Sequence, residues 1–286
     1  MFYREMSQSH NTHLNNELLL KNAPSIFAEQ PFHDVSEKYG FIPTINVIDG
    51  LRDNGWFPVD ATQKNVRLVE KENFTKHLVR FRRLNDDIQV GDSVVELVLT
   101  NSHDRTSGFI LHAGIFRMAC ANGIVVADST FQKVSVRHSQ HSADRVIEGS
   151  YTIIDEVPKI TSEIESMQNI ELTRNEQMIF ARTALDYMTP EPKKDAPQVL
   201  TADNSIIEQM LRPKRVADVG SDLWGTYNVI QEKCLRGGLR ITKRNAKGQY
   251  RRTTTREVKS IDRSIKLNKA LWDMATQMRS LKKEVA

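Results

Sequence analysis

The spacing of apolar residues changes once along this chain, and that change constrains the fold more than any other feature. Between Val66 and Arg137 the sequence runs in short segments rich in β-branched and aromatic residues, separated by Asn, Asp and Gly. Such segments are typical of strands joined by turns. Past Asp144 the apolar residues recur about every 3.6 positions, the period of an amphipathic helix. The sequence therefore predicts an α+β protein whose N-terminal half holds an antiparallel sheet packed with helices.

Turn and helix-end signals divide the N-terminal part further. A short helix over 44–54 is expected to end at Gly55, and Asn122-Gly123 suits a tight turn with positive φ. Helices are also expected over 162–170 and 175–188. Strands are predicted at 66–69, 74–83, 93–100, 108–111, 124–127 and 131–137.

The last third of the chain is expected to be a helix, a basic β-hairpin and a C-terminal helix. Ser221 can cap the first helix and Gly237-Gly238 can end it, while Ser260 can cap the last. The hairpin strands are expected over 239–244 and 249–255. These signals predict a disordered N-terminus at 1–16, an α+β core domain at 17–188, a proline-containing linker at 189–221 and a separate helix–hairpin–helix lobe at 222–286.

The positive charge of the chain is concentrated in one segment. Residues 236–269 contain 12 Lys or Arg against only Glu257 and Asp262, which leaves 28 basic and 34 acidic residues elsewhere. The segment thus has a net charge of +10, and the remainder of the chain has a net charge of −6. Such a concentration indicates a polyanionic partner, most often nucleic acid, because neutralising phosphates releases counterions. A solvated surface is the alternative. The candidate nucleic-acid-binding residues here are Arg240, Lys243, Arg244, Lys247, Tyr250, Arg251, Arg252, Arg256, Lys259 and Arg263, with Tyr250 able to stack on a base.

A second basic surface is predicted on the strand over 74–83. Alternation places Lys76, Arg80 and Arg82 on one face of that strand. Such a face could follow a nucleic-acid backbone. Polar outer faces are also common on antiparallel sheets, so a solvated face is the alternative.

The signals for catalysis are weak. Cys120 with His103, His112, His138 and His141 is the only set that could bind a metal or form a Cys–His nucleophile pair, and its spacing does not match a zinc site. Cys120 is better interpreted as a small buried hydrophobic residue. The sequence also lacks a phosphate-binding Gly-rich loop and the common hydrolase motifs. The expectation is a protein that is not an enzyme, with no cofactor and no metal.

Composition also bears on the compartment. No run approaches the roughly 18 apolar residues of a membrane span, and the first residues do not have the pattern of a secretory signal. Two cysteines are too few for a disulfide framework. A cytoplasmic protein without membrane contact is expected.

Four stretches carry a resemblance to a known family. They are GLRDNGW at 50–56, LTNSHD at 99–104, FRMACANG at 116–123 and RRTTTR at 251–256. They resemble the signature stretches of a family of unknown function borne by phages and plasmids, often labelled phage/plasmid-like proteins, and the likeness covers about 40–279. It implies a mobile-element setting in a bacterial host cytoplasm and no known reaction. The expected architecture is similar to that of single-strand annealing proteins of the RecT, Redβ and Erf kind, which assemble into rings or filaments.

The basic segment, the basic strand face and the missing catalytic motifs lead to one functional expectation. The chain is expected to bind single-stranded DNA and promote strand annealing in phage or plasmid recombination, as a homo-oligomer. The alternative is an anti-restriction or anti-defence protein that binds and inhibits a host defence or replication protein through its acidic remainder.

Overall fold

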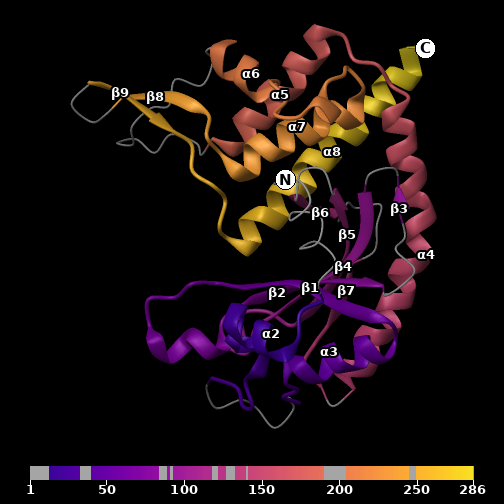
Figure 1. Ribbon diagram of the computed structural model, residues 1–286, viewed down its shortest axis with the longest axis vertical. Coiled ribbons are helices and arrows are strands. Elements are labelled where there is room, and N and C mark those ends of the chain that lie inside the picture. Colours follow the sequence, from indigo (N-terminus) through magenta and orange to yellow (C-terminus); the bar gives the residue numbers. More distant parts are fainter. Residues whose placement is uncertain are drawn as a thin grey trace, which may run out of the picture. The chain divides into compact units, whose positions relative to one another are not determined.

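The computed structural model describes residues 13–32, 40–83, 89–90, 93–117, 122–126, 133–139, 141–189, 204–244 and 249–285 (Figure 1). It divides into two compact units, residues 1–159 and residues 160–286, called unit 1 and unit 2 below. Unit 1 contains an antiparallel sheet and short helices, whereas unit 2 contains helices and a two-stranded ribbon. The predicted α+β class is therefore confirmed.

The sheet of unit 1 is antiparallel throughout. Its main path is β1-β2-β4-β5-β6, with β3 pairing to β4 and β7 pairing to β5. The strands are β1 (Trp56–Gln63), β2 (His77–Arg83), β3 (Gln89–Val90), β4 (Ser93–Asn101), β5 (Phe109–Arg117), β6 (Asn122–Val126) and β7 (Val134–Val136).

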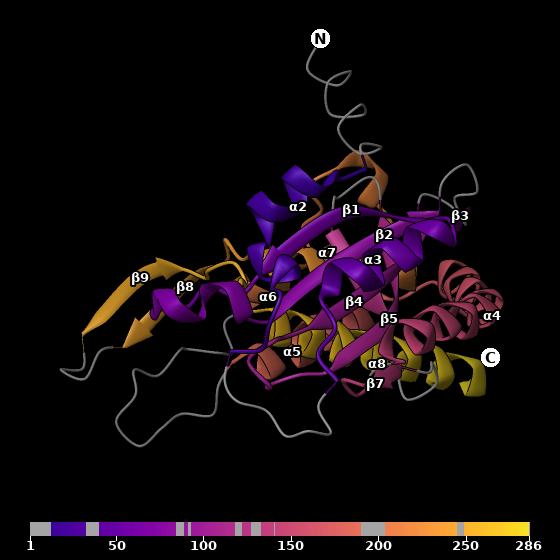
Figure 2. The same ribbon diagram turned by 90° about the horizontal axis from the view of Figure 1, so that it is seen from below.

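Strand β4 lies between β2 and β5, and all of its residues are buried. Its sequence SVVELVLTN is nearly continuous in apolar residues, as expected for a strand covered on both faces. Part of the covering in unit 1 comes from α2 (Asn16–Asn22), η1 (Pro24–Phe27) and α3 (Thr44–Asp53), which pack beside β1 (Figure 2). Helix α3 buries Val47, Ile48 and Leu51, and Gly55 follows it with φ of 84°. The predicted helix over 44–54 is confirmed.

Two local predictions in unit 1 are wrong. The strand expected at 66–69 is absent, since residues 66–68 are irregular and η2 (Val69–Phe74) begins at Val69. Asn122 and Gly123 do not form the expected turn either, because both lie in β6 and pair with Arg117 and Phe116. Cys120 and Ala121, the first half of that turn, lie outside the described residues. Pairing with β5 therefore overrides the local turn preference of this dipeptide.

Unit 2 is built around α7 (Leu223–Arg236). This helix packs against α5 (Arg174–Met188), α6 (Asn204–Met210) and α8 (Ile261–Val285). Trp224 stacks on Tyr227 with ring centroids 5.4 Å apart, and Trp272 of α8 meets both rings edge-on. This aromatic cluster forms the centre of the unit.

Helix α4 (Ser142–Gln168) runs across the boundary between the units, where the sequence predicted a helix only at 162–170. The two units are divided after residue 159, whereas the sequence predicted the linker between the domains at 189–221. Helix α5 packs with α7 and α8 in unit 2, and α6 and η3 (Val216–Asp218) fall inside the expected linker. Most of the expected disordered N-terminus lies outside the described residues. Within its described part, Asn15 caps α2 by accepting a hydrogen bond from Leu18 N at 2.9 Å.

Candidate nucleic-acid interface

The basic segment forms a two-stranded ribbon, as predicted. Strand β8 (Arg240–Arg244) pairs with β9 (Tyr250–Thr254), and the register joins Arg240 to Thr254 and Arg244 to Tyr250. The ribbon extends away from the helices of its own unit (Figures 1 and 2). Its charged strands are therefore accessible to a partner.

Two glycines join this ribbon to α7. Gly237 and Gly238 have φ of 69° and 84°, a region that side chains rarely adopt. A Cβ on Gly237 would lie 2.7 Å from the carbonyl carbon of Arg256. Gly237 therefore lets the chain leaving β9 pass against the end of α7, and so helps to place Arg256.

A side chain of α6 holds the other edge of the ribbon. Gln209 Oε1 accepts a hydrogen bond from Arg240 N at 2.8 Å, and Gln209 Nε2 donates to Arg240 O at 3.2 Å. The side-chain amide thus pairs with β8 much as a neighbouring strand would. It ties the base of the ribbon to the helices of unit 2.

The register divides the ribbon into two faces. Successive residues of a strand point to opposite faces, so Ile241, Arg251 and Thr253 share one face while Arg252 and Tyr250 lie on the other. Ile241 is buried, whereas Tyr250 is 63% exposed. The basic residues therefore line both faces of the ribbon.

The predicted contact residues in this region are exposed wherever their side chains are described. Within the described ranges, no ion pair joins a carboxylate to Arg251, Arg252 or Arg256. The nearby Glu257 pairs with Arg236 at 2.7 Å instead. Three positions give no information, since the side chains of Lys243 and Arg244 are not described and Lys247 lies outside the described residues. The exposed members of the set are Arg240, Tyr250, Arg251, Arg252, Arg256, Lys259 and Arg263.

A groove of about 770 Å³ lies beside the ribbon within unit 2. The end of α5, both ribbon strands and the segment leading into α8 line it. Its apolar lining comes from Leu185, Met188, Ile241 and Val258. The sequence did not reveal this groove, because Leu185 and Met188 are more than fifty residues from the ribbon.

Three guanidinium groups also line the groove, those of Arg251, Arg256 and Arg263. Arg263 Nη2 donates to the carbonyl of Met188 at 3.4 Å, where a cation also complements the C-terminal end of α5. Glu257 is the acidic residue of the lining, and its carboxylate is paired with Arg236. The groove is therefore apolar in part and positively charged overall.

The second predicted basic surface differs from expectation. Arg80 Nε and Nη2 lie 2.6 and 2.9 Å from the two oxygens of Glu96, and Arg82 Nε lies 2.8 Å from Glu96 Oε1. Arg82 is 4% exposed and Glu96 1% exposed. Burial alone would lower the pKa of Arg80, but the Glu96 carboxylate outweighs it and raises that pKa.

Glu96 on β4 thus binds the two arginines of β2 across the strand pair. Arg82 is buried in this pairing and is not part of an exposed basic face, and Arg80 is half-buried. Lys76 is also half-buried and lies just before β2. The ribbon is therefore the better supported of the two predicted surfaces.

The histidines form a different site from the one the sequence suggested. His77 and His103 have ring centroids 5.6 Å apart, and His138 lies 6.0 Å from His103. Thr44 Oγ1 lies 2.9 Å from His77 Nε2 and 3.0 Å from His103 Nε2, and Asn101 Nδ2 donates to it at 3.0 Å. We call His77, His103, His138 and Thr44 the histidine cluster.

Hydrogen bonding assigns the tautomers of two of these rings. His77 Nδ1 lies 2.8 Å from Ser25 Oγ and 3.2 Å from the carbonyl of Thr75. The carbonyl can only accept, so Nδ1 carries the proton and Nε2 accepts from the Thr44 hydroxyl. Thr44 Oγ1 then accepts from His103 Nε2. Burial lowers the pKa of His77 to about 4 and that of His103 to about 3, so both rings are neutral at pH 7.

The cluster differs from the Cys–His set that the sequence left open but did not favour as a metal or nucleophile site. Cys120 lies outside the described residues, and His141 is exposed. On β5 the ring of Phe109 contacts His138, and His112, three residues further along the strand, points to the opposite face of the sheet. The described residues contain no group of His, Cys, Asp or Glu that could hold a metal ion. The sequence missed His77 and Thr44, because their role depends on contacts between distant segments.

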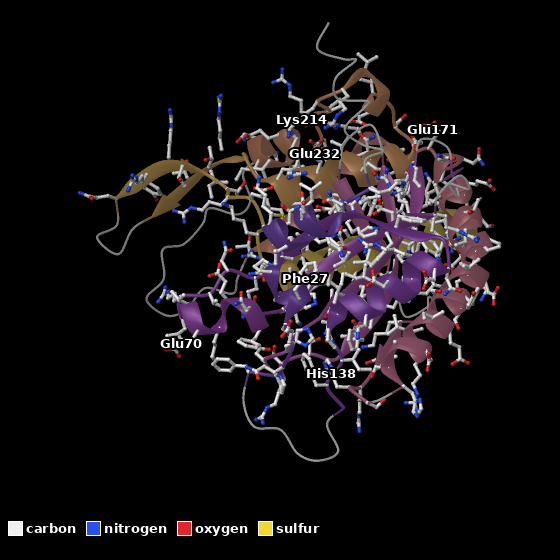
Figure 3. All side chains as sticks on the ribbon, turned by 60° about the horizontal axis from the view of Figure 1, so that its bottom comes forward. Phe27, Glu70, His138, Glu171, Lys214 and Glu232 are labelled. Atoms are coloured by element: carbon white, nitrogen blue, oxygen red, sulfur yellow. The ribbon has the colours of Figure 1, made fainter. Side chains whose placement is uncertain are left out.

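An ion-pair network fixes the segment before α7. Glu232 accepts from both terminal nitrogens of Arg215 at 2.9 and 3.0 Å and from Lys214 at 3.2 Å (Figure 3). Arg215 Nη1 also donates to Asp218 at 3.2 Å. Burial alone would raise the pKa of Glu232, but its bonds to Arg215 and Lys214 outweigh burial and lower it. This network supports the helices that carry the ribbon.

Fold and site together define an α+β protein that presents an arginine-rich ribbon beside a partly apolar groove. The chain belongs to the family described as Domain of unknown function (DUF932), whose model matches residues 31–272. It is 38% identical over 262 residues to UPF0380 protein YfjQ and, equally, to UPF0380 protein YafZ, both of Escherichia coli (strain K12). Each alignment covers 92% of this chain and 90% of the relative.

No solved structure matches the chain. Membership of a family of unknown function, expected from the four stretches, is thus confirmed. Among the described helices, none is long and apolar enough to cross a membrane.

Proposed function

We propose that this protein binds single-stranded DNA through the ribbon and promotes annealing of complementary strands in phage or plasmid recombination, without catalysing a reaction. The observation that carries the proposal is the set of exposed arginines on β9 and after it. Within the described residues, Arg251, Arg252 and Arg256 form no ion pair with a carboxylate. Unneutralised guanidinium groups held on a projecting ribbon are suited to phosphate contacts.

The pattern on the outer face supports a single strand as the ligand. We call the face of the ribbon that carries Ile241 the inner face and the opposite one the outer face. Tyr250 and Arg252 lie two residues apart on the outer face of β9, and both are exposed. An aromatic ring beside a cation can stack on a base and hold the adjoining phosphate. Stacking of this kind needs an unpaired base, and it tolerates any sequence because every base has a flat π-face.

Annealing and self-assembly are the further parts of the proposal. A protein that holds a strand by its phosphates and some stacked bases leaves other base edges open to a complementary strand. Rings or filaments of the RecT, Redβ and Erf kind would align such sites along the DNA. The cytoplasm of a bacterial host and a mobile-element setting fit this function.

The test is fluorescence anisotropy of a labelled single-stranded oligonucleotide across a salt series. In a single strand each phosphate contact contributes about 0.7 to the slope of log affinity against log salt. The triple variant Arg251→Ala, Arg252→Ala and Arg256→Ala should therefore reduce the magnitude of this negative slope by roughly 2. The reduction should be the same for every base sequence.

A matched variant removes equal charge from exposed positions of unit 2 that belong neither to the ribbon strands nor to the groove lining. It combines Arg182→Ala, Arg212→Ala and Lys283→Ala. This variant should keep the slope within the error of measurement. Equal losses for the two triple variants would show general electrostatics and reject the role of the ribbon.

Mixing complementary dye-labelled strands tests annealing, and electron microscopy of the same mixture tests assembly. Faster annealing with protein, together with rings or filaments, supports the proposal. Absence of DNA binding at low salt would reject it. The remaining explanation would then be the anti-restriction or anti-defence alternative, in which the chain inhibits a host protein.

A further inference from the structure

The groove beside the ribbon differs from the outer face in having an apolar lining. We propose that this groove binds one unstacked nucleobase of the DNA strand, with the adjoining phosphates held by Arg251 and Arg256. The inference rests on the proposed function and adds to it a defined pocket for a base. It assigns the inner face of the ribbon, whereas Tyr250 and Arg252 belong to the outer face.

The size and lining of the groove fit a base. Its volume of about 770 Å³ falls within the roughly 300–1,000 Å³ typical of small-molecule sites. Leu185 and Ile241 are 4% and 6% exposed, and Met188 and Val258 are half-buried beside them. A flat aromatic ring placed in the groove would be removed from water together with the accessible parts of Met188 and Val258, while Leu185 and Ile241 form its already buried floor.

One hydroxyl group in the groove wall suits the polar edge of a base. Thr189 donates its hydroxyl to Leu185 O at 2.8 Å, and Thr255 Oγ1 accepts from Leu239 N at 3.1 Å. Thr253, on the same face of the ribbon as Ile241, has no hydrogen bond to any other described residue through its hydroxyl. A hydroxyl both donates and accepts, so that of Thr253 can meet the edge of any base.

The charges of the groove explain why the base should belong to a nucleic acid. Arg251 and Arg256 line the groove, and the carboxylate of Glu257 is already paired with Arg236. A DNA strand places a flat apolar ring beside each phosphate, which matches an apolar lining flanked by guanidinium groups. An acidic peptide could satisfy the arginines but offers no such ring beside each charge. In a duplex the bases are stacked, so a paired base would first have to flip out.

The test places an aromatic side chain in the groove without changing any charge. Thr253 lies on the inner face of β9, opposite Ile241. Thr253→Phe should occupy the part of the groove beside Ile241, where the base is proposed to lie, and an aromatic residue suits a strand, so the ribbon should persist. The matched control is Thr242→Phe, a half-buried position on the outer face of β8 that does not line the groove.

Stacking of one base is worth about 1–3 kcal/mol, so Thr253→Phe should weaken binding of an oligo-dT strand by about 10-fold, with its salt slope unchanged. Thr242→Phe should bind at least as well as the unchanged protein. An oligonucleotide that lacks bases at successive positions also loses the stacking proposed for Tyr250, so it should bind the unchanged protein at least about 10-fold more weakly than oligo-dT does. It should bind Thr253→Phe and the unchanged protein equally well. Circular dichroism checks that both variants are folded.

Equal affinity of the unchanged protein for the strands with and without bases would overturn the groove proposal. So would equal affinity of Thr253→Phe and the unchanged protein for oligo-dT. In the second case a steep salt slope that depends on the ribbon arginines would leave the proposed function intact. The first case would also remove the stacking on Tyr250 and would leave only phosphate binding by the arginines. If a poly-Glu peptide bound in a Thr253→Phe-sensitive manner and oligo-dT did not bind, both proposals would fail.

Discussion

The histidine cluster should make unit 1 sensitive to mild acid. Burial lowers the pKa of His77 to about 4 and of His103 to about 3, whereas a histidine in an unfolded chain titrates near 6.5. Below pH 6.5 the unfolded chain therefore binds protons that the folded chain excludes. The free energy of unfolding must then fall as the pH falls from about 6.5 toward the folded-state pKa values.

The size of this effect follows from the same pKa values. With an unfolded-state pKa of 6.5 and a folded-state pKa of about 4, His77 should cost about 2 kcal/mol at pH 5 relative to pH 7.5. His103, whose folded-state pKa is lower still, should cost about the same at pH 5. Together the two histidines should remove about 4 kcal/mol, a large part of the 5–15 kcal/mol typical of a folded domain.

The assay is urea unfolding at pH 7.5, 6.0 and 5.0 in a background carrying Trp224→Phe and Trp272→Phe. Trp56, buried in β1, is then the only tryptophan and reports on unit 1. His77→Gln should be less stable at pH 7.5, because it disturbs the bonds to Ser25 and Thr44. It should nevertheless lose about 2 kcal/mol less than its parent between pH 7.5 and pH 5.

The control is His141→Gln. The side chain of His141 is 76% exposed and lies outside the histidine cluster, so this variant controls for the replacement of a histidine by glutamine elsewhere in unit 1. If His77→Gln lost as much stability as its parent between pH 7.5 and pH 5, His77 would not be buried in its neutral form. The reasoning from the cluster would then be refuted.

Three further predictions concern unit 2. Glu232→Gln should lower its stability by about 2 kcal/mol, because Arg215, which is 30% exposed and keeps Asp218, loses its two charge-assisted bonds to Glu232. Urea unfolding followed by tryptophan fluorescence in a Trp56→Phe background measures this. Gly237→Ala should lower the thermal midpoint more than Gly238→Ala, because both have positive φ but only at Gly237 would the new Cβ meet backbone, 2.7 Å from Arg256. Equal shifts would argue against that close approach. Burial raises the pKa of the Cys234 thiol, so mass spectrometry after alkylation should find Cys234 modified only in unfolded protein.

Several features of the fold could be predicted because they depend on neighbours in the sequence. The helix before Gly55, the ribbon and the exposure of Arg251, Arg252 and Arg256 are of this kind. Alternation, turn residues and helix ends are local signals. A run of arginines without apolar neighbours cannot be buried cheaply, so its exposure followed from composition.

Other features depended on which distant segments meet. Arg82 occupies the face of β2 that the alternation indicated, but only pairing with β4 brings Glu96 to it and allows its burial. The histidine cluster joins Thr44, His77 and His103 from a helix, a strand and a strand end.

The α+β class, the ribbon and the location of its positive charge follow from the amino-acid order alone, since periodicity and charge are properties of the local chain. The packing of α5 with the ribbon's unit, which lines the groove with Leu185 and Met188, depends on tertiary contacts. So does the extension of a strand through Asn122-Gly123, where the local preference is a turn. Periodicity tells which face of an element is apolar, but the segment that covers this face is selected by long-range packing and strand register.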